Sequence, residues 1–307
     1  MNQIQGFDTF RPIGPSLETR THRRRQSKHN PVVRFIIYLI LAVGAFTMIA
    51  PLWWTFVTSL SDPLHYFTWP PRLWPVPTVW QNYVSGWTQL PFTKWLWNTL
   101  ILSAVCAVGG VLANSTAGYA FAYFRFPGRD FLFFLMLATM LIPGQIQMVP
   151  KYVIWAKLHL LNTWVPLWLP AFFAAPFNIF FYRQFLLSQS LEILESAEID
   201  GASPVQIFTK IILPMCRPIN LIMALWYVSW KWNDWFEPFL YLTDWKNKGT
   251  VALGLQVLRY KSGIGLGQVI QWGPLLAVSL LLSIPPIIFY ALVQRRFVET
   301  FIFTGQR

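Results

Sequence analysis

Charged side chains are scarce in this 307-residue chain. Asp, Glu, Lys and Arg together make up 12% of it, whereas hydrophobic residues make up 55% and aromatic residues 18%. Soluble globular domains carry about 25% charged residues, so the composition excludes an ordinary soluble domain and indicates an integral membrane protein. The 24 basic residues outnumber the 12 acidic ones. They lie between apolar stretches rather than on one basic face, so we expect no nucleic-acid partner.

The chain also has few residues that carry chemistry. Its two cysteines, Cys106 and Cys216, do not have metal-ligand spacing, and its four histidines are scattered. It lacks the G-x-x-x-x-G-K-[ST] phosphate loop, and the only candidate for a membrane-embedded transferase site is the sequence WNDWFEP at residues 232–238. We therefore predict that the chain is not an enzyme, binds no metal and holds no cofactor of its own.

We expect no signal peptide. Residues 1–30 are polar and contain the run RTHRRRQSKHN, and the apolar stretch that follows is too long for a signal sequence and lacks a convincing cleavage site. We predict that residues 1–30 form a disordered basic tail in the cytoplasm. The tail would lie next to anionic lipid as a topology anchor, with a partner-binding arm as the alternative.

Long apolar stretches are plentiful, and a membrane helix needs about 20 mostly apolar residues. Five stretches qualify clearly, and a sixth contains four charged residues; the six are residues 35–60, 95–124, 131–150, 158–182, 214–242 and 262–294. We predict an all-α integral membrane protein with six transmembrane helices. Its segments are a first transmembrane helix at 31–60, a Pro/Trp-rich outer loop at 61–94, a five-helix core at 95–294 and a C-terminal tail at 295–307.

The distribution of positive charge sets the orientation. If the N-terminus lies inside, 15 of the 24 Lys and Arg residues fall on the cytoplasmic side, as the positive-inside rule requires. The sixth helix matters here, because without it the basic C-terminus and the acidic segment near residue 195 would lie on opposite sides. We predict that both termini are cytoplasmic.

The acidic segment EILESAEIDGASPVQIFTKIILP begins at residue 192 and interrupts the apolar chain. It predicts two short helices separated by a sharp turn. Gly201 suits the position after a helix end. Ser203 suits an N-cap, Pro204 suits the first helical position, and Gln206 can close a capping box onto Ser203. Such a segment is a shaped loop outside the bilayer, with an ordinary amphipathic surface helix as the alternative.

This segment resembles the EAA loop of ABC importer permeases. The matching positions are Glu195, Ala197, Asp200, Gly201, Ala202, Phe208, Ile211, Leu213, Pro214 and Pro218. The sequences LIPGQIQMVPKY, LLNTWVPLWLPAFFAAPFNIFFYRQF and WKWNDWFEPFLYLTD are similar to segments of the carbohydrate-transporting, MalG-like branch, and the resemblance covers residues 35–298. Ser196 stands where the family usually has alanine, and the ending VETFIFTGQR lacks the glycine-rich C-terminus common in the branch.

The resemblance implies a MetI-like permease fold in a bacterial plasma (inner) membrane, with a cytoplasmic coupling loop at residues 188–213. The implied partners are a second homologous permease, two ATPase subunits that carry ATP and Mg, an extracytoplasmic sugar-binding protein and the bilayer. The residues that it implies for ATPase docking are Glu195, Ser196, Ala197, Asp200, Gly201, Ala202 and Phe208. Ala197 and Gly201 would let the partner approach closely.

Polar residues within the apolar stretches are candidates for the substrate pathway. They are Asn114, Gln145, Gln147, Asn178, Trp230, Asn233, Asp234 and Glu237. The alternative for the amides is hydrogen bonding between helices, and for Trp230 it is packing or interface anchoring. Lys231, Asp234 and Glu237 share one helix side, so Lys231 and Asp234 can form an ion pair.

These three charged residues leave two functions open. They fit a gate or a binding-protein contact at the outer end of a permease, or a self-satisfied pair. They would also serve an ion-coupled secondary transporter, although that alternative lacks visible inverted repeats and leaves the EAA-like loop unexplained.

Overall fold

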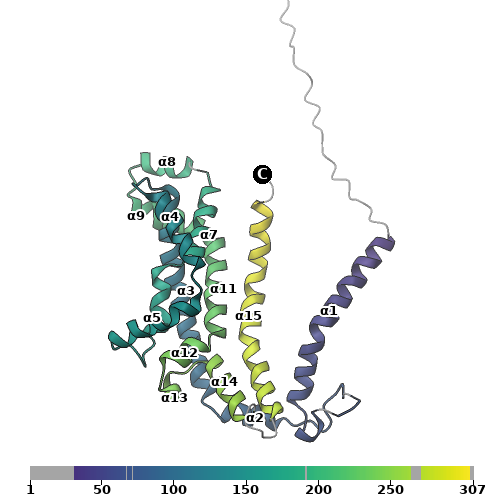
Figure 1. Cartoon of the computed structure of the whole chain (residues 1–307). Helices are drawn as coiled ribbons and strands as arrows, with labels where there is room; N and C mark the ends of the chain where they lie inside the picture. Colours follow the sequence, from purple (N-terminus) through teal and green to yellow (C-terminus); the bar gives the residue numbers. More distant parts are fainter. Residues whose placement is uncertain (1–30, 67, 71, 191, 264–270, 305–307) are drawn as a thin grey trace, which may run out of the picture. The chain divides into compact units, whose positions relative to one another are not determined.

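The computed structural model describes residues 31–304, apart from residues 67, 71, 191 and 264–270 (Figure 1). Every regular element within these residues is a helix, which confirms the predicted all-α class. The tail predicted at residues 1–30 lies outside the described residues, as do residues 305–307. The chain divides after Ala50 into two units, which are described separately.

The first unit contains the beginning of helix α1 (Pro31–Ser59), which continues through Pro51 into the second unit. Residues 31–50 are exposed throughout and predominantly apolar. A helix with apolar side chains on all sides is typical of a segment surrounded by lipid, so α1 agrees with the first predicted transmembrane helix.

The second unit contains the helices that form the other predicted spans. They are α3 (Phe92–Tyr123), α4 (Arg129–Ala138), α5 (Gly144–Lys157), α6 (Val165–Trp168), α7 (Pro176–Leu187), α11 (Arg217–Asn233) and α15 (Trp272–Thr304). Among the described residues, four helices are long and apolar enough to cross a membrane, and there are six if each of two bent helix pairs counts as one crossing. The predicted six spans correspond to this upper count.

The span predicted at residues 131–150 is broken and does not form one straight helix. Helices α4 and α5 are separated by a short break and bent by 99°. The cause is Pro143, because the residue before a proline avoids the helical conformation. Ile142 accordingly has φ −80° and ψ 113°, which is extended backbone. Helix α4 and the 3-10 segment that follows it therefore end well before they are long enough to cross a membrane.

The predicted span at residues 158–182 is also interrupted. Helix α6 and a 3-10 segment at Leu169–Phe173 end at Ala174, whose φ of 57° is unusual for a residue other than glycine, and α7 begins at Pro176. The interruption frees the N–H of Ala175, which donates to Asn114 Oδ1 on α3 at 2.7 Å. Asn114 thus satisfies a backbone group that would otherwise lie unpaired inside the helices.

The two remaining spans end elsewhere than predicted. Helix α11 stops at Asn233, and Phe236–Tyr241 form the separate helix α12, so Asp234 and Glu237 lie beyond the end of α11 rather than within a helix running to residue 242. The segment Pro204–Met215 meets α11 at 76°. Helix α15 continues to Thr304 and includes most of the predicted C-terminal tail.

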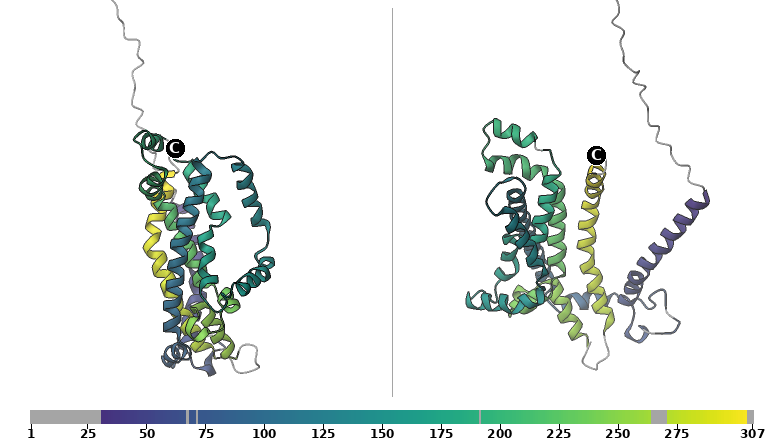
Figure 2. Two further views of the ribbon diagram at one scale, coloured as in Figure 1. Left: turned by 90° about the vertical axis from the view of Figure 1, so that its left-hand side faces the viewer. Right: turned by 45° about the horizontal axis from the view of Figure 1, so that its top comes forward.

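Helix α3 is central to the second unit, since it packs along both α7 and α11 (Figures 1 and 2). Glycine permits this closeness at two points. A Cβ on Gly110 would overlap the ring of Tyr227 on α11, and a Cβ on Gly118 would overlap Tyr182 on α7. Small residues at such positions let helix backbones approach closely in membranes.

Short helices gather at the two ends of this unit. Helices α8 (Glu192–Ile199) and α9 (Pro204–Ile207) lie at one end, and α2 (Gln81–Thr88), α12, α13 (Trp245–Lys248) and α14 (Val251–Lys261) lie at the other (Figure 1). The two groups of short helices therefore lie at opposite ends of the long helices that connect them.

The end formed by α12–α14 is fastened to α3 by hydrogen bonds. Trp95 Nε1 donates to the carbonyl of Trp245 at 2.8 Å, and Asn98 Nδ2 donates to the carbonyls of Asn247 and Gly249 at 3.0 and 2.9 Å. Asp244 begins α13, and hydrogen bonds from Asn247 hold the pKa of its carboxyl below the usual value. These bonds make this end a fixed part of the helix bundle.

Candidate functional site

The acidic loop has the two-helix form that its sequence predicts. Helix α8 is closed at its C-terminal end by a pair of backbone hydrogen bonds: Gly201 N to Glu198 O and Ala202 N to Ala197 O, both at 3.0 Å. This pairing is the Schellman motif, which needs a left-handed residue at the turn. Gly201 supplies it with φ +77°, so the predicted glycine stop is confirmed.

The start of α9 is also as predicted. Gln206 N donates to Ser203 Oγ at 3.3 Å, and Ser203 N donates to Gln206 Oε1 at 2.8 Å. Pro204 occupies the first helical position. The capping box satisfies two backbone donors that a helix start leaves free, and together with the closed end of α8 it gives the loop a defined shape.

Three of the predicted docking residues face inward. Ala197, Ala202 and Phe208 are half-buried and pack on a core cluster that includes Tyr119 of α3 and Tyr182 of α7. The rings of Phe208 and Tyr119 have their centroids 5.7 Å apart. The expected open face with Ala197 and Gly201 is therefore only half correct, because Ala197 is turned toward the chain's own core.

The outer side of the loop carries the other predicted residues, Glu195, Ser196, Asp200 and Gly201, all exposed. Sequence reasoning missed three apolar residues on the same loop: Ile193, Ile199 and Val205 are exposed, and Ile199 keeps 86% of its surface. The sequence spacing could have identified two of them. Leu194 and Ala197, three residues apart, lie on the inward side of α8, and Ile193 and Ile199 lie on a different side of the same helix.

Two of the predicted pathway residues are buried among helices. Asn114 Nδ2 and Asn178 Nδ2 both donate to the hydroxyl of Tyr227, at 3.0 and 3.2 Å. Neither side chain lines the large cavity described below. The structure thus gives both amides the helix-to-helix contacts that were the alternative interpretation.

The glutamines predicted for the pathway lie on α5, away from that cavity. Gln145 is exposed, and the half-buried Gln147 donates through Nε2 to the carbonyl of Ile142 at 3.2 Å. This bond stabilises the sharp corner between α4 and α5. The two side chains are not brought together with the other candidates.

Lys231, Asp234 and Glu237 form a compact ionic cluster where α11 ends. Lys231 Nζ lies 2.9 Å from Asp234 Oδ2 and 2.6 Å from Glu237 Oε2. Asp234 Oδ1 also accepts the backbone N–H of Glu237 at 3.1 Å. The predicted Lys231–Asp234 pair is confirmed, and Glu237 joins it, so one ammonium group holds the corner between α11 and α12.

We expect Lys231→Met to destabilise the protein by roughly 3–5 kcal/mol, because it would leave two carboxylates without their counter-charge. Only 10% of the Lys231 side chain and 7% of the Asp234 side chain are accessible, so water cannot replace the lost ammonium. Thermal unfolding of the purified protein in detergent measures the effect.

Arg129→Met is the matched control, because Arg129 pairs with the exposed carboxylate of Asp130. Removing an exposed pair costs at most about 1 kcal/mol. Equal melting temperatures for the two variants would contradict the structural role assigned to Lys231.

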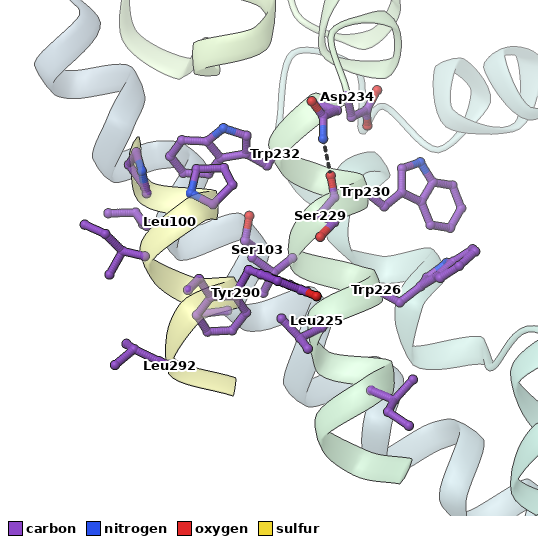
Figure 3. A pocket seen from close by; sticks show the side chains of 18 of the residues that line it. Leu100, Ser103, Leu225, Trp226, Ser229, Trp230, Trp232, Asp234, Tyr290 and Leu292 are labelled. Atoms are coloured by element: carbon purple, nitrogen blue, oxygen red, sulfur yellow. Dashed lines mark hydrogen bonds between the residues drawn. The ribbon is translucent and has the colours of Figure 1, made fainter. Parts of the chain in front are cut away.

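A cavity of about 1330 Å³ lies between α3, α11 and α15 (Figure 3). Its lining includes Trp230, Asn233 and Asp234, which were predicted for the substrate pathway, and it does not include Glu237. Sequence reasoning missed Ser103 on α3 and the α15 wall that follows Pro285, because no local pattern shows which apolar helices enclose a common space.

Comparison with known proteins agrees with this arrangement. The family model described as binding-protein-dependent transport system inner membrane component matches residues 110–299. The sn-glycerol-3-phosphate transport system permease protein UgpE of Yersinia pestis (biovar Antiqua, strain Antiqua) is 31% identical over 270 residues, which cover 85% of this chain and 93% of that protein. The protein of the same name from Salmonella typhi is 31% identical over 272 residues, with the same coverage.

A solved structure shows the same fold. A chain of a bacterial ABC transporter involved in the import of the acidic polysaccharide alginate superposes with a TM-score of 0.74 at 22% identity, covering 88% of this chain and 98% of that chain. The likeness confirms the predicted MetI-like fold.

The same comparisons decide between the two functions left open by the sequence. No finding supports an ion-coupled secondary transporter, and the family is one of transport subunits rather than enzymes. Such a permease works in the inner membrane, within a complex that includes an ATPase and a binding protein. With its family model spanning residues 110–299 and its relatives matching over most of their length, the chain belongs to the binding-protein-dependent inner membrane components, the permease subunits of ABC importers.

Proposed function

We propose that this chain forms half of the translocation pathway of a carbohydrate importer. A second, homologous permease would supply the other half. Two ATPase subunits would bind ATP and Mg, and an extracytoplasmic binding protein would deliver the solute. The names of the relatives support a carbohydrate-type substrate, since one refers to a polyol phosphate and the other to a polysaccharide.

The observation that carries this proposal is the two-sided loop at Glu192–Ile207. Its inner side packs on α3 and α7, and its outer side presents acidic groups together with exposed Ile193, Ile199 and Val205. Apolar residues ringed by polar ones are typical of the centre of a protein interface. We assign this outer side to the ATPase subunit.

The inner side explains how docking would move the pathway. Phe208 contacts Tyr119 on α3, and Ile207 joins the cluster that includes Tyr182 on α7. Closely packed interiors transmit displacement because they contain little free space. A shift of the loop when the ATPase closes on ATP would therefore shift α3 and α7.

The proposal fixes the orientation, with the α8–α9 end and both termini in the cytoplasm. In intact cells we expect a membrane-impermeant thiol reagent to label cysteine at Val84 or Tyr260 and to spare cysteine at Asp200. All three positions are exposed. They lie on α2, on α14 and after α8, which are at opposite ends of the second unit (Figure 1).

The control is the same labelling after the membrane is permeabilised, when Asp200→Cys should react as fast as the others. Labelling of Asp200→Cys in intact cells would contradict the orientation. Affinity purification of this chain as an active transporter without a second permease would contradict the heterodimer.

A further inference from the structure

The cavity between α3, α11 and α15 has polar groups that the chain itself does not use. Ser103 is 2% exposed, and its Oγ has no hydrogen-bond partner within the described residues. Figure 3 shows Ser103 on α3 and Ser229 on α11 turned toward the same space. A buried hydroxyl without a partner costs free energy, so this one is suited to a bound solute.

Aromatic rings form much of the remaining wall. Trp226 and Trp230 of α11 and Tyr290 of α15 line the cavity, and each has more than half of its surface exposed. Their ring faces are apolar, and their N–H and O–H groups are available at the rim. Binding sites for small molecules commonly combine such apolar walls with a few polar groups that fix the orientation of the ligand.

The charge in the cavity is of one sign. Asp234 is the single charged group among the described residues that line it. Its nearest cation, Lys231, is already paired with Asp234 and Glu237, so it is not free to bind an anionic ligand. Phosphate and carboxylate ligands are normally held by free Arg or Lys groups, and the described lining offers none.

We infer that this cavity accepts a neutral polyhydroxylated solute and disfavours phosphorylated or acidic ones. The C–H face of a sugar would lie against the rings of Trp226 and Trp230, and its hydroxyls would pair with Ser103, Ser229 and Asn233. The inference rests on the proposed carbohydrate importer and narrows its substrate class. It separates this chain from a relative named for sn-glycerol 3-phosphate, which is an anion.

The test measures the charge preference of the cavity directly. In the assembled transporter, Cys106 and Cys216, both buried, are replaced by alanine, and Ser229→Cys at an exposed position of the lining provides the only reactive thiol on this chain. Methanethiosulfonate reagents of similar size, one cationic and one anionic, are compared after normalisation to their rates with free cysteine. We expect the cationic reagent to react faster by on the order of tenfold, as one nearby negative charge predicts.

The same thiol reports solute binding. Glucose, maltose and glycerol are added as neutral probes and sn-glycerol 3-phosphate as the anionic one. We expect a neutral probe to slow the labelling of Ser229→Cys and sn-glycerol 3-phosphate to leave it unchanged. Faster reaction of the anionic reagent, protection by sn-glycerol 3-phosphate, or no protection by any neutral probe would overturn the inference.

Two comparisons keep the result interpretable. If Ser229→Cys reacts in the purified full chain and not in the assembled transporter, a partner subunit fills the cavity and the inference is wrong. Sugar uptake by the parent transporter is measured separately. An absence of uptake with a normal reagent preference would count against the importer proposal and leave the charge preference of the cavity established.

Discussion

We expect Gly201→Val to lower solute uptake by about tenfold and to release the ATPase subunits during purification, while the chain remains inserted in the membrane. Gly201 has φ +77°, a conformation that costs a residue with a Cβ roughly 1–2 kcal/mol and a β-branched one more. A new Cβ there meets nothing within 4 Å in this chain. The loop would therefore relax to another shape, and docking would have to restore the original one. If restoring it costs about 1.4 kcal/mol, the affinity for the ATPase falls by about a factor of ten.

Gly128→Val is the matched control for this experiment. Gly128 has φ +79° and likewise no neighbour within 4 Å of its added Cβ, but it precedes α4 and lies outside the α8–α9 loop. We expect this variant to keep most of its uptake and its ATPase subunits. Equal losses in the two variants would show that backbone strain alone, rather than docking, caused the defect.

We expect Gly110→Leu to prevent stable folding of the helix bundle. A side chain at this position would occupy the space of the Tyr227 ring, so α3 and α11 would have to separate. Overpacking of a close core typically costs about 1–3 kcal/mol, and here it would also break the hydrogen bonds from Asn114 and Asn178 to Tyr227. The yield of monodisperse protein in detergent measures the loss.

Gly44→Leu controls for the larger side chain. Gly44 lies in α1, where an added Cβ meets nothing within 4 Å, and we expect a near-normal yield of monodisperse protein. A normal yield of monodisperse Gly110→Leu protein would contradict the close packing of α3 against α11 at Tyr227.

The parts of the loop that were predictable depend on local chemistry. Gly201 stops α8, and Ser203, Pro204 and Gln206 start α9, because each of these residues acts within one turn of the backbone. The side of α8 that faces inward was not predictable in the same way. It depends on Tyr119 and Tyr182, which are distant in sequence and reach the loop only through the packing of α3 and α7.

The sequence analysis did not predict the helix bends, because a run of apolar residues shows where a span lies but not whether the helix within it is straight. Residues 131–150 carry no charged side chain and were predicted as one span, although Pro143 forces the turn between α4 and α5. The break at Ala174 has a similar signal, since Ala175 precedes Pro176 and has extended backbone. The partner that satisfies the freed backbone N–H is Asn114 on another helix, and no local pattern identifies it. For the same reason Asn114 was assigned to the pathway rather than to the bundle.

The most direct test of the coupling role is site-specific crosslinking from the outer side of the loop in intact membranes. A photoreactive amino acid is placed at Ile199, which is 86% exposed, and at the buried Leu194 on the same helix. We predict a crosslinked product between Ile199 and the ATPase subunit, with little from Leu194, and a changed yield from Ile199 when ATP and Mg are added. The absence of an ATPase crosslink from Ile199, in a transporter that still takes up its solute, would contradict the assignment of this loop as the coupling element.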